Sequence, residues 1–332
     1  MVLTAQDSTK MVYERVSRSA QSQAAAGFYK LTFTAMNTAC RVNFRTLEPR
    51  MARDFQNEIL QWVAWFEARY SRFLADSLIS RINSAAGEHW VEIDPETEAL
   101  FNLCQEMIFF SRGVFDPTSL PLIRLWNWKA NPPVIPTEET IKTAKEIVGW
   151  RKVQRRKGGI FLPVKGMCID LGGIGKEYAV DRVLALALQH GIQNVLVDFG
   201  QDVRVHGEPP EKGAWHIGLD DPKNPGHCWV GVALNNHAVA TSGDYVRHFK
   251  KDGRRYGHII DPRTGYPVDN GMLAVSVIAP YCTFAGIVST AAFVLGPKEG
   301  LDLMTVCPGV EGALLTETTR LHTKGFSIYA TS

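Results

Sequence analysis

A glycine-rich segment is the clearest candidate for binding an anion. It reads Asp170-Leu-Gly-Gly-Ile-Gly-Lys176 and stands between a predicted strand, 167–170, and a predicted helix, 176–189. Glycines at a helix N-terminus let backbone N–H groups approach phosphate oxygens, and the helix dipole favours negative charge there. Lys176 would add a compensating cation. A tight turn closed by a capping lysine explains the same residues, so both interpretations stay open.

This segment matches neither of two common nucleotide-binding motifs. In the dinucleotide fingerprint a third glycine is needed where Tyr178 stands. In a phosphate-binding loop of the Walker A type, a serine or threonine follows the lysine, whereas here Glu177 does.

His258 is the candidate general base. It follows the segment Thr241-Ser-Gly-Asp-Tyr245 and precedes Asp261-Pro-Arg-Thr-Gly265, which reads as a turn. A lone histidine is usually structural, but one beside a phosphate site could take a proton near neutral pH.

A third segment, Phe115-Asp-Pro-Thr118, follows a predicted helix that Gly113 ends. Taken alone, it is best explained as a proline turn beside an aromatic core patch that includes Trp126 and Trp128.

Helices and strands without regular alternation must position these segments, which indicates an α+β fold. Apolar residues at helical spacing predict a long helix over 50–73, and Pro95 opens a second helix that runs to Arg112. Strands are predicted at 31–33, 41–45, 195–199 and 313–315. The uncharged stretch 274–296 is interpreted as a buried strand, a break at Pro280 and a buried helix, not as a membrane span. Residues 1–26 are predicted to be a flexible tail, either a loose segment or a frayed helix, before one domain, 27–332.

The composition excludes several classes of partner. The formal net charge is +2 and no block of lysines and arginines occurs, which argues against nucleic-acid binding. The six cysteines are scattered without metal-binding spacing, which argues against a disulfide framework or a structural zinc site. No apolar leader follows the basic residues near the N-terminus, so we expect a cytoplasmic protein.

Together these segments resemble the ApbE family, whose members bind FAD and use magnesium to transfer FMN onto a threonine or serine of a target flavoprotein. The resemblance runs from Met36 to about Leu315. Its segments are Met36-x-Thr38, Phe73-x-x-Asp-Ser-x-Ile-Ser-Arg-Ile-Asn83, Phe115-Asp-Pro-Thr118, Asp170–Lys176 with Tyr178-Ala-Val-Asp181, Thr241–Tyr245, His258–Pro267 and Ser289–Gly296.

The resemblance implies a mixed-sheet ApbE-like fold with helices packed on the sheets. It also implies an FAD site in which Met36, Phe73 and Val114, Phe115 and Asp116 contact FAD. Asp170 and Lys176 would hold its ribose and pyrophosphate, and the backbone near His258 and Ile259 would meet the flavin. His258 would lie nearest the accepting hydroxyl.

The implied magnesium site departs from the family pattern. Gly286 stands where the family has a metal-binding aspartate, four residues before Thr290. Thr290, Ser289 and a carbonyl of Gly173 or Gly175 remain as oxygen ligands, and Asp170, Glu177 or Asp261 could supply the missing charge. An aspartate at 286 would lie one helical turn before Thr290, where both side chains could reach one ion.

Other departures are Asn37, Gln201 and Glu177, each in place of a common glycine of the family. The function that the resemblance implies is FAD:protein FMN transfer with release of AMP. Hydrolysis of FAD to FMN and AMP, or FAD binding without catalysis, are the alternatives.

Overall fold

A nine-stranded sheet forms the centre of the molecule in this computed structural model, which describes residues 5–127, 129–210, 213–244 and 247–331. Every pairing within the sheet is antiparallel. The α+β class with helices packed on the sheet is confirmed, and the sheet is antiparallel where the sequence predicted a mixed one. The strand order is β1 (Gln21–Ala25), β2 (Phe28–Ala35), β3 (Thr38–Arg45), β7 (Asn194–Phe199), β8 (Asp202–His206), β11 (Ala238–Gly243), β16 (Met272–Ala279), β17 (Glu311–Thr316) and β18 (Arg320–His322).

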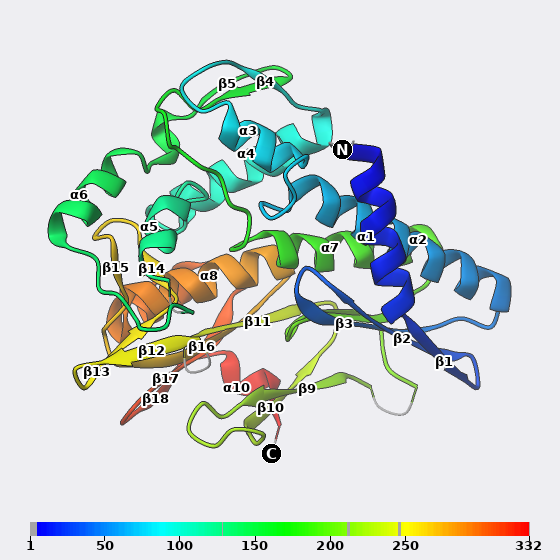
Figure 1. The fold of residues 1–332 in the computed structure, drawn as a ribbon. Coiled ribbons are helices and arrows are strands. Elements are labelled where there is room, and N and C mark those ends of the chain that lie inside the picture. Colours follow the sequence, from blue (N-terminus) through cyan, green and yellow to red (C-terminus); the bar gives the residue numbers. More distant parts are fainter. Residues whose placement is uncertain (1–4, 128, 211–212, 245–246, 332) are drawn as a thin grey trace.

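One face of the sheet carries long helices (Figure 1). Strand β7 shows how one short sequence serves both faces. Val195 and Val197 pack in the large core that includes α2 and α7, while Leu196 between them packs in the core on the opposite face. This alternation follows from the two-residue repeat of a strand. The helices on this face are α1 (Ala5–Ser19), α2 (Pro49–Tyr70), α7 (Gly175–Gln189), α8 (Cys282–Leu295) and α9 (Pro297–Val306).

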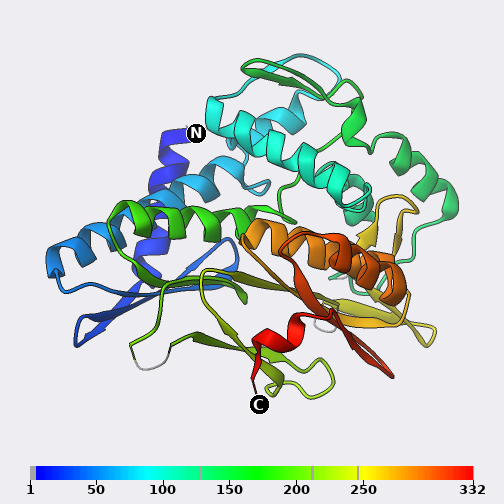
Figure 2. The same ribbon diagram turned by 180° about the vertical axis from the view of Figure 1, so that it is seen from behind.

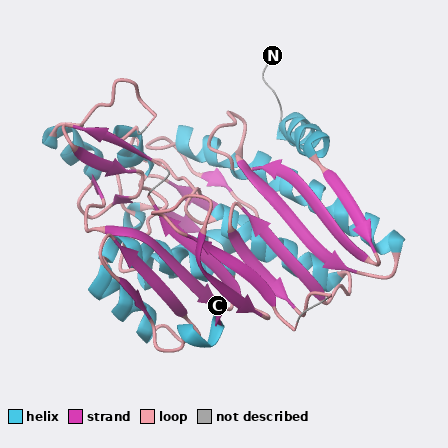
Figure 3. Cartoon of the chain, turned by 90° about the horizontal axis from the view of Figure 1, so that it is seen from below, coloured by secondary structure: helices cyan, strands magenta, loops and turns pink. Residues whose placement is uncertain are grey.

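The opposite face carries a small three-stranded sheet, seen from below in Figure 3. Trp215, Leu219, Val232 and Leu234 of this sheet are buried against the large one. The sheet contains β9 (Trp215–Asp220), β10 (Cys228–Leu234) and β19 (Ala330–Thr331). The short helix α10 (Phe326–Tyr329) comes directly before β19 in the chain.

A further layer lies beyond the long helices and contains the segments between α2 and α7 (Figure 2). Its helices are α3 (Leu78–Ser84), α4 (Pro95–Phe110), α5 (Leu120–Leu125), α6 (Glu138–Glu146) and a 3-10 turn, Trp150–Lys152. Its strands are β4 (Val91–Glu92), β5 (Gln154–Arg156) and β6 (Gly159–Phe161). Two hairpins later in the chain are β12 (His248–Lys251) with β13 (Arg254–Gly257), and β14 (Ile260–Asp261) with β15 (Tyr266–Pro267).

The N-terminal segment differs from the flexible tail that the sequence predicted. Residues 5–25 form α1 and β1, and Val12 and Val16, one helical turn apart, are buried in the core shared with α2. Arg15 of α1 also forms an ion pair with Glu67 of α2, with 2.6 Å between Nη2 and Oε1. In the structure these residues therefore belong to the folded domain.

The segment 167–170 is not the strand that the sequence predicted. The backbone groups of Ile169, in the middle of this segment, pair with a side chain instead. The Asn83 amide accepts a hydrogen bond from the Ile169 N–H at 2.6 Å and donates one to the Ile169 carbonyl at 2.9 Å. A side chain that pairs with both groups of one residue replaces the neighbouring strand that a ladder would need.

The uncharged stretch 274–296 is confirmed as a strand, a break and a helix. Strand β16 is buried along its whole length, and α8 begins two residues after Pro280. Within the described residues, no helix is both long and apolar enough to cross a membrane.

Candidate functional site

The glycine turn lies at the N-terminus of α7, which begins at Gly175. The Gly175 N–H donates to the Leu171 carbonyl at 2.7 Å, and Ile174, the residue before Gly175, gives the other N–H groups of the first turn no side-chain cap. The ring of Phe115 covers the turn, with a ring carbon 3.4 Å from the place that a β-carbon on Gly173 would take. Two segments that the sequence separates by more than fifty residues therefore meet at this turn.

Asp170 joins the turn to two further segments. Its Oδ2 lies 3.2 Å from Nε of Arg72, its Oδ1 accepts from the Gly172 N–H at 3.1 Å, and its own N–H donates to the Pro117 carbonyl at 2.8 Å. Burial raises the pKa of the Asp170 carboxyl, and the positive charge of Arg72 opposes that rise.

Phe73, next to Arg72, is the exposed aromatic residue of this group. Its side chain is 68% exposed, and the Arg72 guanidinium lies 4.2 Å from its ring centre. A large aromatic ring held at the surface by a neighbouring cation offers a face on which a planar ligand could stack.

The neighbours of Phe115 hold it in place from both sides. Val114 is buried among residues of α8. The Asp116 carboxylate accepts hydrogen bonds from Thr118 within its own turn and, at 3.0 Å, from the N–H of Trp150, 34 residues later in the chain. We therefore expect Val114 and Asp116 to position Phe115.

Lys176 is engaged by two carboxylates. Its ammonium pairs with the buried Asp202 of β8 and lies 3.5 Å from Oε1 of Glu177. The lysine thus neutralises charge inside the protein, in addition to any contact with a pyrophosphate.

Met36 occupies a strained turn between β2 and β3. Ala35 pairs with Thr38, so Met36 and Asn37 form a two-residue hairpin loop, and both have positive φ, 50° and 58°. The Met36 N–H donates to Oε2 of Glu67 at 2.8 Å, and Glu67 is itself held by Arg15.

His258 is held by the backbone of Arg247. Its N–H donates to the Arg247 carbonyl at 3.0 Å, and its ring Nδ1 lies 3.2 Å from the same oxygen. Because a carbonyl only accepts, Nδ1 carries the proton and Nε2 keeps its lone pair. Burial, together with the nearby positive charge of Arg247, lowers the pKa of His258 to about 4. Its neighbour Ile259 accepts from the Val268 N–H and packs in the same cluster as Val114.

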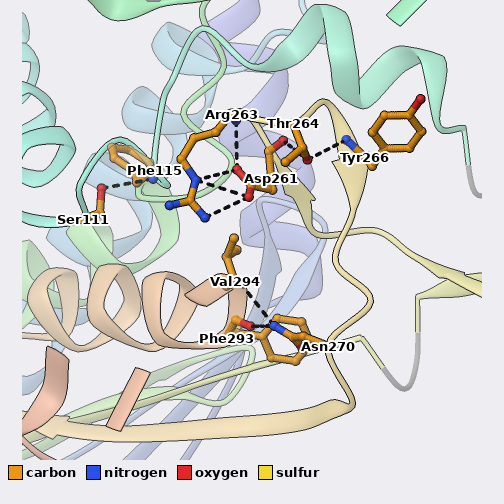
Figure 4. Close-up of polar contacts among 9 residues, drawn as sticks. All are labelled: Ser111, Phe115, Asp261, Arg263, Thr264, Tyr266, Asn270, Phe293 and Val294. Atoms are coloured by element: carbon orange, nitrogen blue, oxygen red, sulfur yellow. Dashed lines mark hydrogen bonds and ion pairs between the residues drawn. The ribbon is translucent and has the colours of Figure 1, made fainter. Parts of the chain in front are cut away.

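The turn after His258 is closed by an ion pair within itself (Figure 4). Arg263 turns back onto Asp261, with Nη2 2.9 Å from Oδ2, and its N–H also donates to that carboxylate. Asn270, further along, donates to the carbonyls of Phe293 and Val294 at the C-terminal end of α8. Asn270 thus supports the end of the helix that carries Ser289 and Thr290.

Ser289 and Thr290 form a small group of hydroxyls with Ser242 of β11. The Ser242 oxygen lies 2.8 Å from that of Ser289 and 2.9 Å from that of Thr290. Ser289 also donates to the Gly286 carbonyl at 2.9 Å. Among the residues that the structure describes, no group of three or more His, Cys, Asp or Glu residues is arranged to hold a metal ion.

Comparison with known proteins decides the family. The profile of the ApbE family matches residues 36–314, which is most of the chain. The chain belongs to the ApbE family. As a member, it is a transferase homologous to the enzymes below along most of its length.

Two relatives of this ApbE-family protein carry the name FAD:protein FMN transferase. That of Treponema pallidum is 30% identical over 89% of this chain and 86% of its own. That of Haemophilus influenzae is 30% identical over 71% of each chain. The crystal structure of the ApbE protein from Thermotoga maritima has a TM-score of 0.83 and 32% identity, and covers 92% of this chain and all of its own.

The ApbE fold brings together some of the predicted site residues directly. Arg72, next to Phe73, pairs with Asp170, and Phe115 covers Gly173. A hollow of about 660 Å³ between α5 and α6 lies apart from them, and none of the predicted site residues lines it. Two residues of the expected motifs lie outside the described residues, Tyr245 and Trp128.

Two residues that organise this ApbE site received no role from the sequence. Ser242 connects the hydroxyls of Ser289 and Thr290, and Asp181 accepts from the N–H groups of Cys282 and Thr283 at 2.9 Å each. Both stand inside segments that carry the family resemblance. Their roles depend on partners 47 to 102 residues away, which no local pattern reveals.

Proposed function

We propose that this ApbE-family protein transfers FMN from FAD to the hydroxyl of a threonine or serine in an acceptor flavoprotein. The observation that carries the proposal is the junction of Phe73, Phe115, Asp170 and the uncapped glycine turn, within a chain that the family matches from 36 to 314. Such a junction offers an aromatic face, backbone N–H donors and a helix N-terminus to a flavin dinucleotide.

The proposed reaction is a displacement at phosphorus. The acceptor oxygen forms a bond to the flavin-side phosphorus of FAD, the bond from that phosphorus to the bridging oxygen breaks, and AMP leaves. The acceptor proton passes to Nε2 of His258, which is neutral at pH 7 because its pKa is lowered to about 4. Positioning and charge neutralisation supply most of the catalysis in reactions of this type.

A divalent metal ion fits the oxygen atoms beside α8. The hydroxyls of Ser289 and Thr290 and the carbonyl of Gly173 would hold it, and Glu177 has a buried carboxylate oxygen without a hydrogen-bond partner. Magnesium prefers such oxygen ligands and would neutralise charge on the pyrophosphate. The protein residues would hold and orient the dinucleotide, with the ring of Phe115 over the glycine turn.

The test is a product analysis. The purified protein is incubated with FAD, magnesium and a candidate acceptor flavoprotein, and the acceptor is examined by mass spectrometry. Acceptor carrying covalent FMN, together with free AMP, supports transfer. Free FMN and AMP without labelled acceptor would show a hydrolase, and unchanged bound FAD would show a flavin-binding protein, so either result would overturn the proposal.

A further inference from the structure

Glu177 occupies the space in front of Gly286. A β-carbon built on Gly286 would stand 2.7 Å from Cγ of Glu177 and 3.2 Å from its Cδ and Oε1. Separations under about 3 Å are not tolerated between such atoms, so a side chain at 286 and Glu177 in its present position exclude one another. A side chain at 286 therefore requires the Glu177 side chain to move out of this space.

The two helices that carry these residues run antiparallel at this point. Asp181 of α7 binds the N–H groups of Cys282 and Thr283, and Glu177, one turn earlier on α7, meets Gly286, one turn later on α8. One further turn in the same direction leads to the glycine turn on one side and to Thr290 on the other. The Glu177 side chain therefore lies between the two helices at Gly286, one helical turn before Thr290.

Three carboxylates could have replaced an aspartate at 286, and the structure separates them. Asp170 is bound by Arg72 and by the Gly172 N–H. Asp261 is bound by the guanidinium and N–H of Arg263. Glu177 alone of the three has an oxygen, Oε2, that is buried and has no hydrogen-bond partner among the described residues.

A buried carboxylate oxygen without a partner is costly unless something else binds it. We propose that Glu177 supplies the carboxylate ligand of the divalent metal ion, and that Gly286 is the residue that makes room for it. The negatively charged ligand would thus come from α7, at Glu177, and not from α8, at position 286. The inference rests on the proposed function only for the presence of a metal ion, not for the transfer reaction.

This arrangement changes what a substitution at 286 should do. An aspartate there would restore a carboxylate on α8, but it would collide with Glu177. Gly286→Asp alone should therefore lower the melting temperature without tightening metal binding. In the double variant, Glu177→Gly removes the side chain that occupies this space, so the aspartate at 286 should fit there and bind the metal.

The experiment measures Mn²⁺ binding by electron paramagnetic resonance and calorimetry on the whole protein, with and without FAD and without acceptor. Four variants are compared with the unaltered protein: Glu177→Gln, Gly286→Asp, the double variant Glu177→Gly with Gly286→Asp, and Glu96→Gln. Glu96 is the matched control because its Oε1 is also buried without a partner, on α4. Melting temperatures show that each variant is folded.

We expect Glu177→Gln to weaken Mn²⁺ binding by about tenfold or more, and the double variant to recover most of that loss. Glu96→Gln should bind as the unaltered protein does. Equal Mn²⁺ affinity in the unaltered protein and Glu177→Gln would overturn the inference, as would no Mn²⁺ binding in the unaltered protein. Because no turnover is involved, Glu177-dependent binding without covalent FMN on an acceptor would reject the proposed function and leave the metal site standing.

Discussion

Asp181 holds the first turn of α8 through Thr283. Its Oδ2 accepts hydrogen bonds from the Thr283 N–H at 2.9 Å and from the Thr283 hydroxyl at 2.7 Å. Its Oδ1 accepts from Arg204 and from the Cys282 N–H. The first N–H groups of a helix have no partner within it, so a residue of α7 caps α8. Asn270 binds the other end, and the position of Ser289 and Thr290 relative to α7 follows from both contacts.

We predict that Asp181→Ala lowers the free energy of unfolding by about 2–4 kcal/mol, because it removes the cap and leaves Arg204 partly buried without its partner. Urea denaturation measures the change. The control is Asp302→Ala on α9, an exposed residue whose removal should change stability by less than about 0.5 kcal/mol. Similar losses in both variants would show that the cap contributes nothing specific.

A second prediction separates the two roles open to Lys176. Lys176→Ala should lower the free energy of unfolding by about 2–4 kcal/mol, because the buried Asp202 loses its partner, and Lys176→Ala with Asp202→Asn should recover most of it. If Lys176 also binds the pyrophosphate, FAD affinity should fall about tenfold in both the single and the double variant. Denaturation and calorimetry are measured on both. An FAD affinity that returns to normal in the double variant would restrict Lys176 to its structural role.

The sequence was sufficient for elements with a strong local pattern. The long helix α2, the helix that Pro95 opens and the strand before Pro280 all lie where apolar spacing and proline placed them. It was insufficient where a distant side chain decides local structure. Residues 167–170 have the composition of a strand, but Asn83, 86 positions away, takes the hydrogen bonds that a neighbouring strand would need. The N-terminal helix likewise depends on burial of Val12 and Val16 against α2.

The site shows the same division. The glycine turn could be recognised because its residue types already suggest anion binding, and the turn does begin a helix. The residue types did not reveal which side chains the charged residues beside the turn would contact. Lys176 pairs with Asp202 and Glu177 meets Gly286 because α7 packs against both β8 and α8, and no periodic pattern in the sequence reveals that packing.

The lowered pKa of His258 predicts an unusual pH dependence. A histidine with an ordinary pKa of 6.5 would lose half its neutral form at that pH, whereas His258, with a pKa of about 4, keeps its lone pair far into the acid range. We therefore expect kcat/KM for transfer to stay flat from about pH 8 down to about pH 5. His258→Asn should abolish transfer while FAD stays bound. His216→Ala, at an exposed histidine of β9, is the control and should leave the rate unchanged. An acid limb centred near 6.5 would show that another group titrates.

The same pKa has a consequence for stability. Between pH 6.5 and about 4 the unfolded chain binds a proton at residue 258 that the folded protein does not bind, so folding loses stability as the pH falls through this range. Above pH 6.5 both states are neutral there and the contribution vanishes. His258→Asn should therefore flatten the decline of the melting temperature between pH 6.5 and pH 5, compared with the unaltered protein. An unchanged decline would mean that His258 has an ordinary pKa in the folded protein.

Phe73 and Phe109 allow a matched test of the aromatic face. Both rings are largely exposed, 68% and 87%, so replacing either with alanine removes little buried surface and should leave the melting temperature nearly unchanged. Phe73 adjoins Arg72, which pairs with Asp170, whereas Phe109 lies at the end of α4. If FAD stacks on Phe73, Phe73→Ala should weaken FAD binding by about three- to tenfold, and Phe109→Ala should leave it unchanged. Calorimetric titration of both variants with FAD gives the answer. Equal dissociation constants for the two variants and the unaltered protein would remove Phe73 from the FAD site, and its exposure would then have no explanation in flavin binding.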